Sequence, residues 1–211
     1  MEDKFVLVAC EESQRVCAEF RKLGFIAFSC DIKPESGGHP EWHIQGDVLD
    51  VLYPPLYFKT MDCMVHRVPK WDLIIAHPPC TRLCNSGQRW RFWGSDEQRK
   101  RKERETVDAI KFFMTFAMLT NCDHIAIENP VGIMSNIYRK PDCIYNPYDF
   151  AGETDCKKLV CGCEDCRRLN QRNHSHRNNE HKTYGKHISM ANRIPGIHPK
   201  QLGYGVKHLL V

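Results

Sequence analysis

Short apolar segments separated by a helical segment are the feature of this 211-residue sequence that most constrains its fold. Residues 5–10 (FVLVAC) and 25–30 (FIAFSC) have the length and composition of buried strands. Residues 11–23 between them place apolar side chains at helical spacing among charged ones. A strand, a helix and a second strand in this order typically form a parallel pair. The sequence therefore predicts an α/β fold with a mostly parallel sheet.

The same alternation continues as far as about residue 140. We expect two more buried strands, a long helix, a short strand end and an inserted hairpin, at residues 71–77, 124–127, 96–120, 45–48 and 57–68. After residue 141 the sequence is rich in Cys, His, Asn and charged residues, and its periodicity is lost. We therefore expect a main domain at 1–148, a Cys/His-rich insertion at 149–188 and a C-terminal segment at 189–211 that returns to the main domain.

Composition excludes a membrane protein and favours a cytoplasmic one. No apolar run approaches the roughly 20 residues that span a bilayer. The first residues also lack the basic and then apolar layout of a secretory signal. In the cytoplasm, the twelve cysteines are expected to be reduced thiols, metal ligands or catalytic groups, not disulfides.

Positive charge is concentrated at the C-terminal end of the chain. The net charge is only +4, yet residues 151–211 carry 11 Lys and Arg against 5 Asp and Glu, with six of the eleven histidines. Such a region suits contacts with phosphates, although it also fits an ordinary solvated surface. The charge distribution favours a nucleic acid as the partner.

Acidic residues follow three of the expected strands in turn. Glu11 follows the first strand, Asp31 ends the second, and Asp47 lies one element later. At these places a carboxylate accepts hydrogen bonds from ribose hydroxyls or from an adenine amino group. Carboxylates also cap helices and line loops, so one of them alone carries little weight. Their ordered recurrence predicts a nucleoside site.

Cys80 and Glu128 each follow a buried strand. Cys80 lies on a loop stiffened by Pro78 and Pro79, and Glu128 begins the segment ENPVG. The carboxyl ends of parallel strands are where open α/β sheets bind ligands. We therefore expect these two residues to be a nucleophile and an acid, although a buried structural cysteine and an ion-paired glutamate remain the alternatives.

These two loops resemble the central motifs of DNA cytosine-C5 methyltransferases, which usually read Pro-Pro-Cys-Gln and then Glu-Asn-Val. The chain is most similar to a compact, phage-type branch with Cys-Glu-x-Ser, His-Pro-Pro-Cys-Thr and Glu-Asn-Pro-Val-Gly. The likeness covers roughly residues 5–150. It implies a Rossmann-like fold and transfer of a methyl group from S-adenosylmethionine to C5 of cytosine in DNA.

The resemblance also implies roles for individual residues. Cys80 attacks C6 of a base that has left the duplex, and Glu128 holds the pyrimidine at N3 and the amino group. The implied cofactor contacts are Glu11, Asp31, Asp47 and Pro78. The implied substrate contacts are Thr81, Asn129, Pro130 and Arg193, the last in a segment similar to the Pro-Gly terminal part of the compact branch.

The chain departs from the family pattern at four places, one of which is the family's Gln-x-Arg-x-Arg motif, which has no clean match here. The first loop, residues 11–15, contains no glycine, although the family's loop is glycine-rich. Thr81 replaces the usual glutamine after the cysteine. A target-recognition domain of the usual size does not fit in the chain. The approach to the cofactor and the sequence specificity are therefore expected to differ.

Four closely spaced cysteines predict a zinc site in the polar segment. The predicted ligands are Cys156, Cys161, Cys163 and Cys166. Four thiolates close tetrahedrally on Zn²⁺ and fold a segment too polar to form its own core. The spacing is not a standard pair of C-x2-C motifs, and four free thiols are the alternative. We expect this segment to present arginines to DNA in place of the missing recognition domain.

Two other functions remain open at this stage. An exocyclic-amino methyltransferase is one, although its family motif, (Asp/Asn/Ser)-Pro-Pro-(Tyr/Phe/Trp), differs from residues 77–80 at both ends. A catalytically silent nucleic-acid-binding module on the same fold is the other. Trp90, Phe92 and Trp93 on the loop after Cys80 suit stacking on bases, or else anchor that loop.

Overall fold

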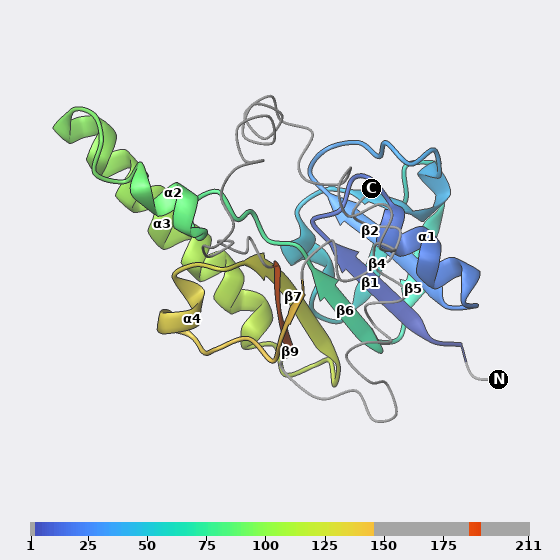
Figure 1. Cartoon of the computed structure of the whole chain (residues 1–211). Helices are drawn as coiled ribbons and strands as arrows, with labels where there is room; N and C mark the ends of the chain where they lie inside the picture. The colour runs from blue at the N-terminus through green and yellow to red at the C-terminus, as the bar shows by residue number, and fades with distance from the viewer. Residues whose placement is uncertain (1–2, 146–185, 191–211) are drawn as a thin grey trace, which may run out of the picture.

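The computed structural model describes residues 3–145 and 186–190 (Figure 1). Its centre is a seven-stranded sheet of order β3-β2-β1-β6-β7-β9-β8, in which the first five strands are parallel. The last two strands are antiparallel to their neighbours. The predicted α/β class with a mostly parallel sheet is confirmed. The strands are β1 (Phe5–Ala9), β2 (Ile26–Asp31), β3 (His43–Gln45), β6 (Leu73–Ala76), β7 (Ile125–Pro130), β8 (Cys143–Tyr145) and β9 (Lys186–Met190).

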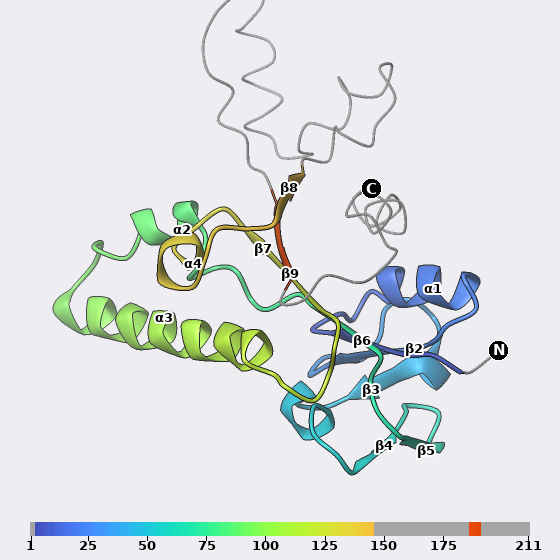
Figure 2. The ribbon, with the colours of Figure 1, turned by 90° about the horizontal axis from the view of Figure 1, so that it is seen from below.

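Helices cover the two faces of the sheet (Figure 2). Helix α1 (Arg15–Lys22) packs Val16 and Phe20 on one face, in a cluster with Val6 and Val8 of β1. Side chains alternate along a strand, so the neighbouring Leu7 and Ala9 belong to the core of the other face. That core also contains the C-terminal half of α3 (Asp96–Ala117). Burial on both faces explains the unbroken apolar runs in the sequence.

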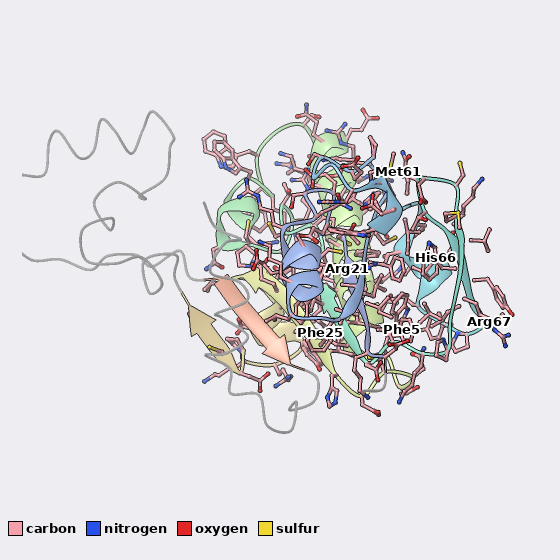
Figure 3. The ribbon with its side chains drawn as sticks, turned by 90° about the vertical axis from the view of Figure 1, so that its right-hand side faces the viewer. Phe5, Arg21, Phe25, Met61, His66 and Arg67 are labelled. Atoms are coloured by element: carbon pink, nitrogen blue, oxygen red, sulfur yellow. The ribbon has the colours of Figure 1, made fainter. Side chains whose placement is uncertain are left out.

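The predicted hairpin is confirmed. Strands β4 (Leu56–Lys59) and β5 (Val65–Val68) pair in antiparallel fashion. His66 packs its ring 4.9 Å from that of Phe28 in β2, whereas Arg67 points out of the body (Figure 3). The hairpin therefore extends the core beneath β2, far from the loops that follow β6 and β7.

An arm follows β6. It consists of α2 (Asn85–Arg89), a turn and the first half of α3, and it extends away from the sheet (Figures 1 and 2). Ser95 and Gln98 form a capping box that starts α3. Trp90, Phe92 and Trp93 in the turn are 60%, 74% and 67% exposed, so they do not anchor the turn in a core.

Two element boundaries differ from the prediction. The third strand lies at His43–Gln45, whereas Asp47 caps the short 3-10 helix Val48–Val51 by accepting a hydrogen bond from the Leu49 amide. Strand β7 continues through Glu128 to Pro130, where a loop was predicted. The reason is β9, which pairs with β7 along this stretch and supplies hydrogen bonds that local sequence does not reveal.

Strand β9 returns to the main sheet from a distant part of the sequence. It spans the predicted boundary between residues 188 and 189, and residues 146–185 and 191–211 lie outside the described part of the chain. The domain boundaries therefore stay a prediction.

Within residues 3–145 and 186–190, no helix combines the length and apolar character that crossing a bilayer requires.

Candidate functional site

The carboxyl ends of the five parallel strands meet at one edge of the sheet. Strand β1 lies between β2 and β6. The chain therefore builds β2 and β3 on one side of β1 and later adds β6 and β7 on the other side. Such a switch point is where open α/β sheets bind ligands. Asp31, His77 and Glu128 lie at this edge, on or directly after β2, β6 and β7.

Cys80 begins a helical turn after β6. Its carbonyl oxygen accepts hydrogen bonds from the amides of Leu83 and Cys84, both at 2.9 Å. Pro78 before it is buried, and its carbonyl accepts a hydrogen bond at 3.4 Å from Nδ2 of buried Asn129. The backbone around Cys80 is therefore held by a turn on one side and by β7 on the other, and the Cys80 side chain is half-buried.

The Cys80 loop and the segment after Glu128 interlock. The Asn85 amide donates to the Val131 carbonyl at 3.2 Å, and the Ile133 amide donates to the Leu83 carbonyl at 2.9 Å. A Cβ at Gly132 would lie 1.9 Å from the Leu83 oxygen, so only glycine allows this approach. The two motifs predicted separately from the sequence thus form a single unit.

Glu128 and His77 form a hydrogen-bonded pair. Ala76 and Ile127 are partners in the parallel register, so the next residues of the two strands lie side by side. His77 Nδ1 is 3.2 Å from Glu128 Oε2. Their side chains are 24% and 12% exposed, so the pair is largely withdrawn from solvent.

A cavity of about 390 Å³ opens at the same edge, beside β1, β2 and β3. Asp31 and Asp47 contribute carboxylates to it, and the 75% exposed Ile32 contributes an apolar surface. Burial, together with these two carboxylates, raises the pKa of the Cys10 thiol to about 12. This wall of the cavity therefore carries a neutral thiol between two acidic groups. The lining residues are Cys10, Cys30, Asp31, Ile32, Lys33, Gly46, Asp47, Val48, Pro79 and Phe112.

The loop after β1 achieves its turn without glycine. Cys10 and Gln14 have positive φ angles of 61° and 57°, the left-handed conformation that glycine adopts most easily. Glu11 between them is buried, and its carboxylate accepts hydrogen bonds from the Val16 and Cys17 amides at the start of α1. Burial raises the pKa of Glu11 despite these bonds. Its visible role is to cap α1, and the cofactor contact stays a prediction.

The other predicted site residues occupy varied positions. Pro79 lines the cavity, whereas Pro78 is not among its lining residues. Thr81 is exposed and Pro130 is half-buried near Glu128. Arg193 and the four predicted zinc ligands, Cys156, Cys161, Cys163 and Cys166, lie outside the described residues. Within residues 3–145 and 186–190, no three His, Cys, Asp or Glu side chains cluster in a way that could hold a metal ion.

Sequence reasoning missed His77, Cys10 and Phe112 as site residues. His77 directly precedes the Pro-Pro-Cys motif, which is a signal of its position but not of its partner. Phe112 belongs to the apolar pattern of a long helix, and nothing local distinguishes it from a core residue. Whether these residues belong to the site depends on which strands lie next to each other in the sheet, and local sequence does not show that.

The searches of protein-family models and of curated proteins found no match to this chain.

The geometry of the site supports one chemical interpretation. A cavity with two carboxylates in its lining lies at the same sheet edge as a thiol and a carboxyl group held on interlocked loops. Such a site can bind a nucleoside-containing cofactor and present a nucleophile and an acid to a second molecule.

Proposed function

We propose that this chain is an S-adenosylmethionine-dependent methyltransferase that modifies C5 of cytosine in DNA. The observation that carries the proposal is the interlock between the Cys80 loop and the segment after Glu128, at the sheet edge where the carboxylate-lined cavity opens. A nucleophile, a pyrimidine-binding acid and a nucleoside site are the parts that this reaction needs.

The cavity residues fit an adenosyl group. Asp31 would accept hydrogen bonds from the ribose hydroxyls, and Asp47 would accept one from the adenine amino group. The side chains of Ile32 and Phe112 offer apolar surface to the base. When bound, the cofactor supplies an electrophilic methyl group on a sulfonium. Glu11 caps α1 beside this cavity. It would therefore support cofactor binding indirectly, by holding the loop after β1 in its conformation.

Cys80 and Glu128 would carry out the activation of cytosine. The Cys80 thiolate forms a bond to C6, and the electron pair of the C5–C6 double bond moves into the ring. Glu128 donates a proton to N3, which stabilises this electron-rich ring and leaves C5 nucleophilic. After C5 has been methylated, C5 loses its proton to a water molecule. The electron pair of the broken C5–H bond then re-forms the C5–C6 double bond and expels Cys80 as the thiolate. Asn129 and Pro130 next to Glu128 would shape the base pocket, with Thr81 at its rim.

The arm supports DNA as the substrate class. Its exposed Trp90, Phe92 and Trp93 provide faces on which bases stack, ten or more positions after the nucleophile. Lys102 holds the turn by donating to the Trp90 and Trp93 carbonyls at 2.9 and 2.7 Å. Arg193 and a zinc-bound Cys156, Cys161, Cys163 and Cys166 would add contacts from the basic C-terminal region.

The test uses DNA that contains 5-fluorocytosine, together with S-adenosylmethionine. Fluorine at C5 prevents the final proton loss, so Cys80 stays bonded to C6 and a covalent protein–DNA adduct accumulates. We expect this adduct with the wild type and with Cys63→Ser, a control in the remote and exposed hairpin turn. We expect none with Cys80→Ser.

Two other outcomes would contradict the proposal. Methylation of unmodified DNA without any adduct from fluorinated DNA would indicate transfer to an exocyclic amino group. Binding of DNA with neither methylation nor adduct would indicate a silent binding module.

A further inference from the structure

His77 is a half-buried titratable residue at the site edge that the proposed reaction leaves unused. It lies between β6 and the Cys80 loop, and its Nδ1 is 3.2 Å from Glu128 Oε2. Because the two side chains are 24% and 12% exposed, few water molecules compete for this contact. At this distance the imidazole nitrogen and the carboxyl oxygen are joined by a hydrogen bond, along which a proton can pass.

Other titratable groups face the pair from neighbouring elements. Glu11, on the loop after β1, interacts electrostatically with His77, which opposes the rise that burial causes in the Glu11 pKa. Glu12 beside it acts on Glu11 in turn. Cys80 lies three positions after His77 on the same loop. The His77 ring therefore lies close to the carboxyl groups of Glu128 and Glu11, with Cys80 further along its own loop.

The second ring nitrogen of His77 has no visible structural purpose. Nε2 is buried and has no hydrogen-bond partner among the described residues. Burying an unsatisfied polar nitrogen costs about 1–3 kcal/mol. An apolar side chain in this position would avoid that cost, so packing does not explain an imidazole here. An imidazole can pass a proton to Glu128 through Nδ1, which an apolar side chain cannot do.

We propose that His77 is a positioning residue that supplies the proton Glu128 gives to cytosine, an inference that rests on the function proposed above. When Cys80 bonds to C6, the Glu128 O–H bond breaks and an N3–H bond forms. The protonated His77 then transfers its Nδ1 proton to Glu128 Oε2 and becomes neutral. When Cys80 leaves, N3 returns its proton to Glu128 and Glu128 returns one to His77. N3, Glu128 and His77 therefore hold the same number of protons before and after the cycle, and the one proton released comes from C5 and goes to solvent.

The test measures exchange of the C5 hydrogen of cytosine with D₂O in the absence of the cofactor. Attack by Cys80 makes C5 basic, so it takes a deuteron from solvent, and departure of Cys80 releases the original proton. We expect His77→Asn to slow this exchange about tenfold to hundredfold near pH 7.5, a loss within what proton transfer contributes in enzymes. Asparagine still donates a hydrogen bond to Glu128 but supplies no proton.

The pH profile distinguishes proton supply from mere alignment. Without His77, the acid form of Glu128 depends on its own carboxyl group. The pH profile of exchange should therefore differ between the wild type and His77→Asn, because in the variant the decline at high pH is set by the Glu128 carboxyl group alone. Imidazole added to His77→Ala should restore part of the exchange. His39→Asn is the matched control, because His39 forms a comparable 3.0 Å pair with Glu41, exposed and outside the site.

The possible failures can be told apart. Exchange by His77→Asn at the wild-type rate and with the wild-type pH profile would overturn the role of His77 alone. If the wild type neither exchanges hydrogen nor forms the fluorocytosine adduct, the proposed function fails and the proton transfer fails with it. Circular dichroism establishes that the variant is folded, and His77→Gln provides the same comparison if the asparagine variant is not.

Discussion

Single side chains at the edge of the sheet combine structural and chemical roles, and Glu11 shows this most clearly. Its carboxylate accepts two backbone hydrogen bonds at the start of α1, at 2.6 and 3.2 Å, as a helix cap does. It is nevertheless buried next to a site with several other acidic groups, so its negative charge is costly. The cap and the burial act on its pKa in opposite directions, and burial prevails.

The raised pKa of Glu11 predicts how stability changes with pH. The folded protein holds this proton at pH values where the unfolded chain has already lost it. The contribution of Glu11 to the free energy of unfolding is therefore greatest below the ordinary value of 4.5 and falls as pH rises through the folded value. Glu11→Gln removes this titration and keeps an oxygen that accepts one amide bond.

Urea unfolding of both proteins between about pH 4 and pH 8 measures the effect. We expect the wild type to lose free energy of unfolding relative to Glu11→Gln as pH rises, so that the difference between the two proteins decreases steadily. A difference that is constant over this range, or that increases, would show that burial does not dominate the ionisation of Glu11.

The residues whose positions at the sheet edge local sequence predicted best are those with distinctive immediate neighbours. Cys80 follows two prolines after an apolar run, and Glu128 directly follows another apolar run. His77 has neighbours just as distinctive, yet its meaning comes from Glu128, 51 positions away. Only the register between β6 and β7 brings them together, and register depends on strand neighbours rather than local pattern.

At the scale of elements, the site depends on two loops that support each other. Neither loop is long enough to form a core, and each satisfies its backbone groups on the other. Gly132 is where they approach most closely, and Gly87 makes a similar approach to the Thr81 carbonyl within the first loop. Glycines in these motifs therefore serve backbone contact, whereas the loop after β1 reaches its left-handed turns with Cys10 and Gln14.

Gly132→Ala should separate the two loops. The added Cβ would lie 1.9 Å from the Leu83 oxygen, so one backbone segment must move. We expect a loss of about 1–3 kcal/mol in the free energy of unfolding, as overpacking typically costs. Because a movement of either segment displaces Cys80 relative to Glu128, formation of the fluorocytosine adduct should slow as well.

Gly46→Ala is the control for the stability part of this prediction, because a Cβ there meets no atom within 4 Å. Thermal unfolding of the three proteins gives the comparison. Equal losses in the two variants would show that the close approach at Gly132 is not what holds the loops together.

The boundaries of a strand were predictable where its own side chains, and not a partner strand, determine where it begins and ends. The apolar runs located β1, β2 and β6 because both faces of these strands are buried. The end of β7 was not predictable, since its last three residues are polar or proline and are held in the sheet by β9. A partner strand from 186–190 leaves no trace in the local pattern of 125–130.

At the scale of the whole molecule, the site exists because the strand order reverses at β1. The chain builds β2 and β3 on one side, inserts the hairpin, and returns to place β6 and β7 on the other. The carboxylates of Asp31 and Asp47 therefore come from one half of the sheet, and Cys80 and Glu128 from the other. A ligand in the cavity contacts the first half and, through Pro79, the start of the second.

This arrangement predicts that a nucleoside cofactor stabilises the entire domain. A ligand that binds only the folded state at one hundred times its Kd adds about 2.7 kcal/mol to the free energy of unfolding. For a chain of this size the melting temperature then rises by about 5–10 °C. We expect this rise with S-adenosylmethionine, and also with S-adenosylhomocysteine, which has the same adenosyl group without the methyl.

The carboxylates should determine the size of this rise. Asp31→Asn or Asp47→Asn weakens charge-assisted hydrogen bonds, each worth about 1.5–3 kcal/mol, which reduces the shift at the same ligand concentration to about half or less. Asp123→Asn, exposed in the turn before β7 and outside the cavity, should keep the full shift. A full shift in the Asp31 and Asp47 variants would place the cofactor elsewhere, whereas a melting temperature unchanged by either compound in the wild type would exclude the cavity as an adenosyl site. Because the measurement needs no DNA, it separates recognition of the cofactor from the chemistry at Cys80.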